Sequence, residues 1–138
     1  MAKKEKKDRS HASGKRKRAI ARATVRPGTG VVRINSMHIS TMEPEIARLR
    51  LQEPAMLAGE SALKVDIDVN VRGGGWSGQV EASRLAIAKA LAGYFGEEMK
   101  KTFLDYDRHM LVADTRFKEA RKFGTHSRAR AKRQKSYR

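Results

Sequence analysis

The uneven placement of charge along this chain most constrains what it can fold into. Lys and Arg total 31 against 15 Asp and Glu in 138 residues, a formal net charge of +16. Residues 1–18 carry nine basic and two acidic side chains, and residues 116–138 carry ten and one. Residues 19–115 carry twelve of each sign and nearly all of the aliphatic side chains. The pattern predicts a globular body, 19–115, between a basic N-terminal arm, 1–18, and a basic C-terminal tail, 116–138.

Neither basic segment is expected to fold alone. Between residues 121 and 138 there are eight basic side chains, no acid, and only Phe123 and Tyr137 as large apolar groups. Such a segment cannot offset its conformational entropy by burial. Fully extended, residues 116–138 would reach about 75 Å. So much positive charge indicates a polyanion partner, and RNA is favoured over DNA because no helix-turn-helix, finger or zipper pattern occurs.

Composition also excludes several classes of protein. With no cysteine, the chain has no disulfide, thiolate metal site or cysteine nucleophile. No apolar run approaches the roughly 18 residues of a membrane span. The N-terminal lysines are not followed by the apolar region of a secretory signal, and Glu5 and Asp8 argue against a transit peptide. We therefore expect a cytoplasmic protein without membrane contact.

The body reads as alternating strands and helices. Residues 19–26 and 31–35 predict two strands, and the Pro27–Gly30 turn signal suggests that they form a hairpin. Residues 63–72 alternate aliphatic with polar side chains at every position, which predicts a half-buried strand. Residues 110–112 predict a last short strand.

Three helical patterns separate these strands. One begins at Glu43–Pro44 and is expected to end or kink at Pro54; the others cover about 79–93 and begin again at Glu97–Glu98. The order predicts an α+β fold in which a small, mostly antiparallel sheet carries its helices on one face.

Few residue groups suggest catalysis. Asp66, Asp68 and Glu81 could hold Mg²⁺ in a nuclease, but the preferred interpretation of the two aspartates is the solvated face of a strand, paired with nearby cations. The histidines, at positions 11, 38, 109 and 126, show no metal-ligand spacing. We expect no metal, cofactor, small-molecule substrate or catalytic residue. A basic chaperone or DNA-compacting protein is a further alternative.

The glycine run 73–75 is a candidate phosphate site. It lacks the Gly-Lys-Ser/Thr ending of a nucleotide-binding loop, so the plain interpretation is a flexible turn. Arg72 beside it and the helix that follows favour an anion, and an RNA phosphate fits. Trp76 could stack on a base or pack on its own domain; the sequence leaves both open.

Several ordered motifs resemble one family. These are Gly14–Ala23 (Gly-Lys-Arg-Lys-Arg-Ala-Ile-Ala-Arg-Ala), the segment from Gly73 through Gln79 to Leu91, and the set Asp114, Arg116, Glu119, Lys122 and Gly124. Together they resemble the small ribosomal subunit protein nine family over about residues 14–138. The ending, residues 134–138, is similar to its archaeal and eukaryotic branch.

The resemblance implies a two-layer fold with a left-handed βαβ crossover, against the usual right-handed rule. It implies a non-enzymatic structural constituent of the small subunit, bound to rRNA in the head beside neighbouring head proteins, with its tail reaching the anticodon stem-loop of peptidyl-site tRNA. The residues expected to bind rRNA are Lys15, Arg16, Lys17, Arg18, Arg22, Arg72, Gly73, Gly74, Gly75, Arg84, Lys118, Arg121, Lys122, Arg128, Arg130, Lys132 and Arg133. Those expected to contact tRNA are Lys135, Ser136 and Arg138.

Overall fold

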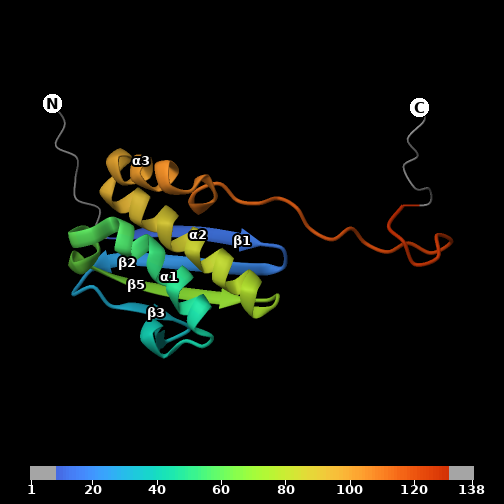
Figure 1. Cartoon of the computed structure of the whole chain (residues 1–138), viewed down its shortest axis with the longest axis horizontal. Helices are drawn as coiled ribbons and strands as arrows, with labels where there is room; N and C mark the ends of the chain where they lie inside the picture. The colour runs from blue at the N-terminus through green and yellow to red at the C-terminus, as the bar shows by residue number, and fades with distance from the viewer. Residues whose placement is uncertain (1–8, 131–138) are drawn as a thin grey trace.

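A five-stranded sheet covered on one face by three helices forms the body (Figure 1). The computed structural model describes residues 9–130. Its strands are β1 (Ser10–Arg16), β2 (Ala19–Pro27), β3 (Val32–Ile34), β4 (Met37–His38) and β5 (Val65–Arg72). Its helices are α1 (Glu45–Ala58), α2 (Trp76–Phe95) and α3 (Glu97–Tyr106), with 3-10 turns at Ile39–Thr41, Gly59–Lys64 and Arg108–Met110. The predicted α+β class is confirmed.

The strand order is β1-β2-β5-β3-β4, and only β3 and β5 run parallel. The connection from β3 to β5 passes through α1 on the helical face of the sheet. Seen from that face with both strands pointing up, β5 lies to the left of β3 (Figure 1). The crossover is therefore left-handed, as the resemblance implied.

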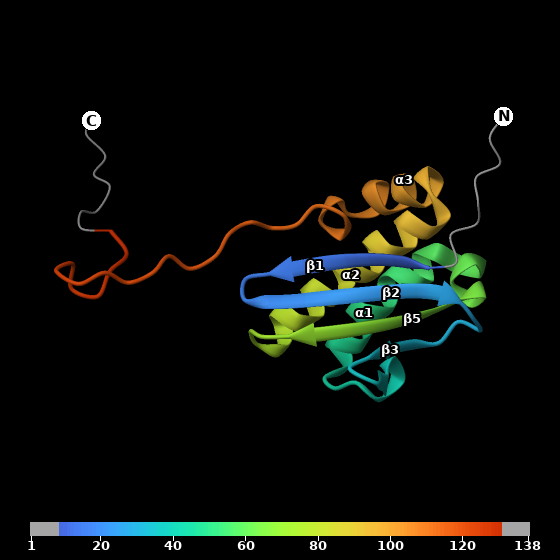
Figure 2. The ribbon, with the colours of Figure 1, turned by 180° about the vertical axis from the view of Figure 1, so that it is seen from behind.

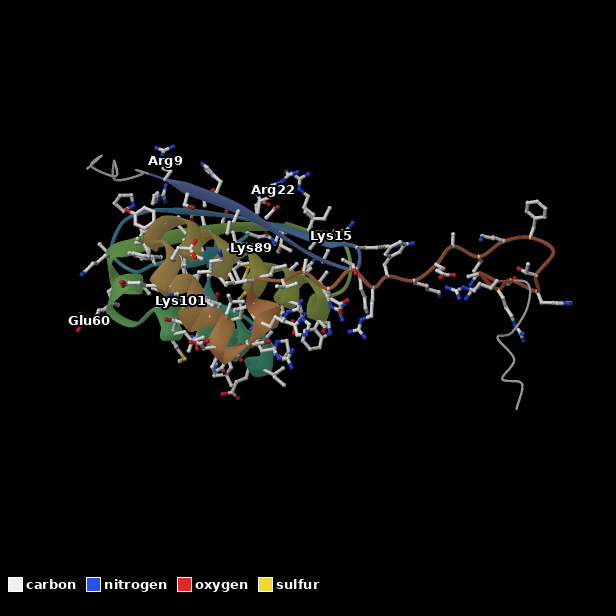
Figure 3. All side chains as sticks on the ribbon, turned by 90° about the horizontal axis from the view of Figure 1, so that it is seen from above. Arg9, Lys15, Arg22, Glu60, Lys89 and Lys101 are labelled. Atoms are coloured by element: carbon white, nitrogen blue, oxygen red, sulfur yellow. The ribbon has the colours of Figure 1, made fainter. Side chains whose placement is uncertain are left out.

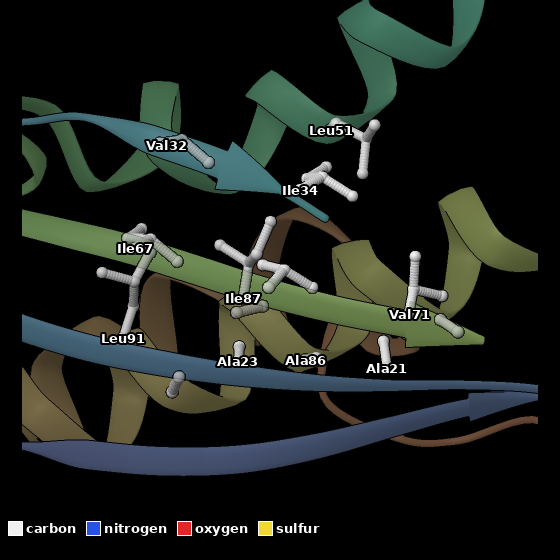
Figure 4. Close-up of a cluster of buried hydrophobic side chains, with 14 of the residues drawn as sticks. Ala21, Ala23, Val32, Ile34, Leu51, Ile67, Val71, Ala86, Ile87 and Leu91 are labelled. Atoms are coloured by element: carbon white, nitrogen blue, oxygen red, sulfur yellow. The ribbon is translucent and has the colours of Figure 1, made fainter. Parts of the chain in front are cut away.

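Small residues bring α2 against the middle of the sheet. Ala21 and Ala23 of β2 lie beneath Ala86 and Ile87 of α2, and all four side chains are at most 1% exposed (Figure 4). On β1, a methyl group added to Gly14 would lie only 2.1 Å from the carbonyl oxygen of Ala82. Close packing of this kind leaves no room for larger side chains. The alanine-rich pattern of the helix is thus explained by its short distance to the sheet.

The predicted hairpin of residues 19–26 and 31–35 is wrong in its pairing. Both strands exist, as β2 and β3, but β5 lies between them and bonds to each. The hairpin partner of β2 is β1, through a tight turn at Lys17 and Arg18 in which Lys17 has a φ of 53°. Residues 10–16, counted above with the basic arm, are therefore a strand of the sheet.

Two other element predictions are corrected. Pro54 does not end α1, which continues to Ala58 because Leu51, Pro54 and Ala58 are all buried against the core. Residues 110–112 are not a strand. Met110 instead ends a 3-10 turn with its side chain fully buried. The predicted strand at 63–72 is confirmed from Val65 onward.

The tail leaves the body beside the β1–β2 turn and extends away from it (Figures 1 and 2). From residue 112 to residue 130 it contains no helix or strand. A local loop forms within it, where the Thr125 hydroxyl donates to the Lys122 carbonyl at 2.7 Å and Glu119 pairs with Arg130 at 2.6 Å. None of the helices within residues 9–130 has the length and apolar character needed to cross a bilayer.

Candidate nucleic-acid interface

An open recess lies at the end of the sheet where the tail begins. Its walls come from the β1–β2 turn, the glycine loop, the N-terminal half of α2, residues of α1 and of the segment 107–109, and the start of the tail. We call it the turn-end recess. Its basic lining residues are Lys15, Arg16, Lys17, Arg18, Arg50, Arg84, Arg116 and Lys118. Six of these were among the predicted rRNA-binding residues, and the fold brings those six together from three separate segments. Arg50 and Arg116 were not.

Two glycines let the loop lie against the turn. Gly73 and Gly74 have φ values of 75° and 69°, which side chains rarely adopt. A methyl group on Gly73 would lie 2.6 Å from the carbonyl oxygen of Arg18, and one on Gly74 would lie 3.1 Å from the amide nitrogen of Ala19. The loop therefore needs glycine here both for its backbone conformation and for its close approach to the turn.

The glycine loop also leaves the start of α2 free of an internal cap. Gly75 is the N-cap residue and supplies no side-chain hydrogen bond. The 20-residue helix behind it presents N–H groups and the positive end of its dipole at the recess. The Gln79 side chain donates to the Gly73 carbonyl at 3.2 Å and braces the loop. This end of the helix suits an anion.

The cations of the recess fall into two groups. Lys15, Lys17, Arg18 and Lys118 have no ion-pair partner within residues 9–130. The other four, Arg16, Arg50, Arg84 and Arg116, form ion pairs with carboxylates of the protein itself. The unpaired cations project into solvent, where they can neutralise a polyanion without breaking an existing contact.

Asp114 is the centre of one internal cluster. It pairs with Arg16 at 2.7 Å and with Arg116 at 2.8 Å, and its side chain is 15% exposed. The side chain and backbone N–H of Arg116 hold the pKa of Asp114 well below its usual value, and Arg16 adds to this effect. The cluster joins the first residues of the tail to β1.

Arg84 is the centre of a second, more buried cluster. Its guanidinium pairs with Glu53 at 2.6 Å and with Asp107 at 2.9 Å, and its side chain is 11% exposed. Burial works to lower the pKa of Arg84, but its hydrogen bonds to Asp107 and the charge of Glu53 raise it. Burial works to raise the pKa of Asp107, but the His109 N–H and Arg84 lower it. Arg84 thus joins α1, α2 and the 3-10 turn; its RNA contact stays a prediction.

Apolar side chains in the recess were missed from the sequence. Phe117 is 74% exposed and Ile20 is 45% exposed, and both line the recess with Trp76, which is 59% exposed. The prediction left the place of Trp76 open, and here it lies largely in solvent rather than in the core. One signal could have pointed to Phe117: it lies between Arg116 and Lys118, an aromatic residue interleaved with cations.

The remaining predicted site residues lie elsewhere. Arg22 and Arg72 project from the open face of the sheet. Arg121, Lys122, Arg128 and Arg130 lie on the tail. Lys132, Arg133, Lys135, Ser136 and Arg138 lie outside the described residues. The RNA contacts of these residues stay predictions.

The carboxylates considered for a nuclease do not meet. Asp66 accepts hydrogen bonds from the N–H groups of Thr29 and Val31, which lower its pKa. Asp68 pairs with Arg26 at 2.8 Å on the open face of the sheet. Glu81 pairs with Arg50 on the helical side. Within residues 9–130, no three His, Asp or Glu side chains gather into a metal site.

The fold and the recess define a class: a small α+β protein with a cationic surface suited to a polyanion. Comparison with known proteins then gives the family. The model described as Ribosomal protein S9/S16 matches residues 14–138. Proteins named small ribosomal subunit protein uS9 from Methanococcus maripaludis strains C7, C5 and S2 are 47%, 47% and 46% identical over 130 residues. Each alignment covers 93% of this chain and 97% of the relative.

The chain belongs to the ribosomal protein S9/S16 family. It is a structural constituent of the small ribosomal subunit and not an enzyme, so the nuclease alternative is wrong. Membership of the family also explains the ordered motifs in the sequence. Parts of each motif, in the β1–β2 turn, the glycine loop and the start of the tail, line the recess.

Proposed function

We propose that the turn-end recess binds small-subunit rRNA in the head of the subunit, and that the tail continues from it to peptidyl-site tRNA. The observation that carries the first part is the convergence of Lys17 and Arg18, the glycine loop and Lys118 on one recess. These segments are far apart in the sequence. Their convergence gives one phosphate-binding surface instead of scattered basic residues.

Electrostatics supplies most of the binding free energy in this proposal. Lys15, Lys17, Arg18 and Lys118 are free of ion pairs within the described part of the chain, so each can neutralise a phosphate and release a counterion. The free N–H groups at the start of α2 add directional hydrogen bonds to a phosphate oxygen.

The exposed apolar side chains select the kind of RNA at this surface. Trp76 and Phe117 present aromatic faces among cations, and base–aromatic stacking contributes about 1–3 kcal/mol per base. Bases can stack on these side chains only where they are unpaired. The recess therefore suits a loop or bulge of rRNA, with its backbone on the cations and a base against the aromatic rings.

The tail is proposed to contact the anticodon stem-loop of peptidyl-site tRNA through Lys135, Ser136 and Arg138. Support comes from the family resemblance of the ending and from the course of residues 112–130, which lead away from the body. Along this course, Arg121, Lys122 and Arg128 are exposed and would bind rRNA phosphates.

Neighbouring head proteins are the proposed protein partners. Ile46, Leu49 and Met56 on α1 are 57%, 51% and 68% exposed, and their spacing places them on one side of the helix. An exposed apolar stripe of this kind is typical of a protein contact.

Reconstitution of small subunits tests the role of the recess. The full-length triple variant Lys17→Gln, Arg18→Gln and Lys118→Gln should be lost from purified subunits in high-salt sedimentation, whereas wild type stays bound. The matched control is Lys89→Gln, Lys101→Gln and Arg108→Gln, which removes the same charge outside the recess and should stay bound. Equal retention of both variants would contradict the proposal.

The role of the tail needs a separate measurement. In reconstituted subunits, Arg138→Ala should raise the dissociation rate of peptidyl-site tRNA without reducing subunit assembly. An unchanged dissociation rate would remove Arg138 from the proposed contact while leaving the recess unaffected.

A further inference from the structure

The face of the sheet opposite the helices is not covered by any segment within residues 9–130 (Figure 2). Alternation along β1, β2, β3 and β5 places one set of side chains in the core and the other set on this open face. In the side view, Arg9 and Arg22 project from the sheet away from the helices that carry Lys89 and Lys101 (Figure 3).

This open face is strongly basic although the body as a whole is neutral. The strands place Lys15, Arg22, Arg26, Arg33 and Arg72 on it, against Asp66 and Asp68. Helices α1, α2 and α3, in contrast, contain six acidic and six basic residues. The balanced charge of the body therefore conceals an asymmetry between its two faces.

Within residues 9–130, the two carboxylates of the open face form an ion pair with only one of its arginines, Arg26. Asp66 is engaged by the backbone N–H groups of Thr29 and Val31, at 2.8 and 3.1 Å. Asp68 pairs with Arg26 at 2.8 Å. No ion pair within the described residues involves Arg22, Arg33 or Arg72.

Strand register sets the spacing of the three unpaired arginines. Arg22 lies opposite Asn70, whereas Arg33 lies opposite Asp68 and Arg72 is two residues beyond Asn70. With strands about 4.8 Å apart and about 6.8 Å between side chains on one face, their Cα atoms are roughly 8–14 Å apart. Such distances suit three separate phosphates on a broad backbone surface better than one small anion.

The polar neighbours of these arginines favour the same ligand. A depression in the face is lined by Arg22, Arg33, Thr24, Asn35 and Asn70, together with the Arg26–Asp68 ion pair, and Ser13 lies opposite Arg22 on β1. Hydroxyl, amide and guanidinium groups are the side chains that bind phosphate and sugar oxygens. Ile20 is the one large apolar residue on the open side of these four strands, which disfavours a protein partner.

The scarcity of aromatic rings decides the form of the nucleic acid. Strands β1 to β5 contain no Phe, Tyr or Trp, and the two imidazole rings on the open side, His11 and His38, are hydrogen-bonded to the hydroxyl groups of Thr24 and Ser40. Unpaired bases therefore find no free, large aromatic ring on which to stack. A duplex presents only its backbone and groove edges, and needs no such ring. We propose that the open face, through Arg22, Arg33 and Arg72, binds the backbone of double-stranded RNA, at a second site on the side of the sheet away from the helices.

This inference rests on the RNA-binding function proposed above but concerns residues that do not line the turn-end recess. The protein would then hold two RNA elements: an unpaired segment at the recess and a helix on the sheet. Since the two sites use different residues, they can be removed separately.

The experiment compares full-length variants on two RNA probes, a blunt duplex and a single strand of equal length, across a range of salt concentrations. The open-face variant is Arg22→Gln, Arg33→Gln and Arg72→Gln. Losing three phosphate contacts should make its log–log salt slope on the duplex about 3 smaller in magnitude and weaken duplex binding about tenfold or more at physiological salt. Single-strand binding should stay close to wild type.

Two further variants keep the result interpretable. The matched control Lys89→Gln, Lys101→Gln and Arg108→Gln should bind the duplex with the wild-type slope. The variant Arg22→Lys, Arg33→Lys and Arg72→Lys should retain most of the slope because charge is preserved. Circular dichroism of each variant should match wild type, since all of the substituted side chains lie at the surface of the protein.

The outcomes separate this inference from the proposed function. Equal losses on the two probes would overturn the assignment to double-stranded RNA. Wild-type binding of both probes by the open-face variant would show that the open face is not an RNA-binding site. If that variant also failed to enter small subunits, the open face would instead be a contact with another protein. Loss of the recess variant from subunits tests only the proposed function and leaves the open-face result unchanged.

Discussion

Gly14→Ala is the substitution that tests the packing of the fold most directly. An ideal Cβ at residue 14 would lie 2.1 Å from the Ala82 carbonyl oxygen and 2.8 Å from the Ala86 amide nitrogen. Ordinary van der Waals contact begins at 3.4 Å, so β1 must move from α2 by about 1.3 Å. Both obstacles are backbone atoms of a helix, which cannot rotate away as a side chain would.

The expected cost lies at the upper end of the range for overpacking, about 3 kcal/mol. For a body of roughly 100 residues this lowers the melting temperature by about 10–20 °C. The control is Gly75→Ala, where φ is negative and a new methyl group meets nothing within 4 Å. Gly75→Ala should lower the free energy of unfolding by less than about 1 kcal/mol, because alanine is a poorer N-cap residue than glycine.

Thermal unfolding of the two variants, followed by circular dichroism, measures the difference. Because β1 also carries Lys15 and leads into the turn, the Gly14 variant should bind RNA more weakly below its melting temperature. A melting temperature for Gly14→Ala equal to that of Gly75→Ala would refute the claim that β1 and α2 are packed to their limit.

Three other substitutions test the two ion-pair clusters and the exposed Trp76 ring of the recess. Arg84→Met should lower the free energy of unfolding by about 2–3 kcal/mol in urea titrations, because Glu53 and Asp107 lose their shared cation; wild-type stability would argue against that cluster. The lowered pKa of Asp114 stabilises the fold above the unfolded-state pKa, near 3.8, and this stabilisation is lost as the pH falls below it. Asp114→Asn should therefore flatten the acid limb of a stability–pH curve, and an unaltered limb would contradict this. Trp76→Ala should leave stability nearly unchanged but weaken single-stranded RNA binding about tenfold, and equal affinity would exclude stacking.

The sequence pattern was sufficient for elements whose burial depends on large side chains. Strand β5 was predicted because aliphatic residues alternate along it, and α2 because its apolar residues recur at helical spacing. Strand β1 was missed for the opposite reason. Its inward residues Ser10, Ala12 and Gly14 are small because α2 lies so close, so they carry no hydrophobic signal.

Strand pairing and the composition of the recess depend on contacts between distant residues. The turn signal at Pro27–Gly30 correctly ended β2, but no local signal shows that β5 enters the sheet between β2 and β3. Likewise, the cations and glycines of the recess could be chosen one by one from the sequence. That Ile20 and Phe117 lie beside them follows only from the folded chain.

The Asp114 cluster has a consequence for how the tail can work. By holding Arg116 and Arg16 together, it fixes the point from which the following 22 residues start, beside the recess. A tether with a fixed origin and a reach of about 70 Å keeps its tip at a high local concentration near any target within that radius. Each contact between the tip and its ligand can then be weak and still form. A tail of this kind can hold a ligand and also release it quickly.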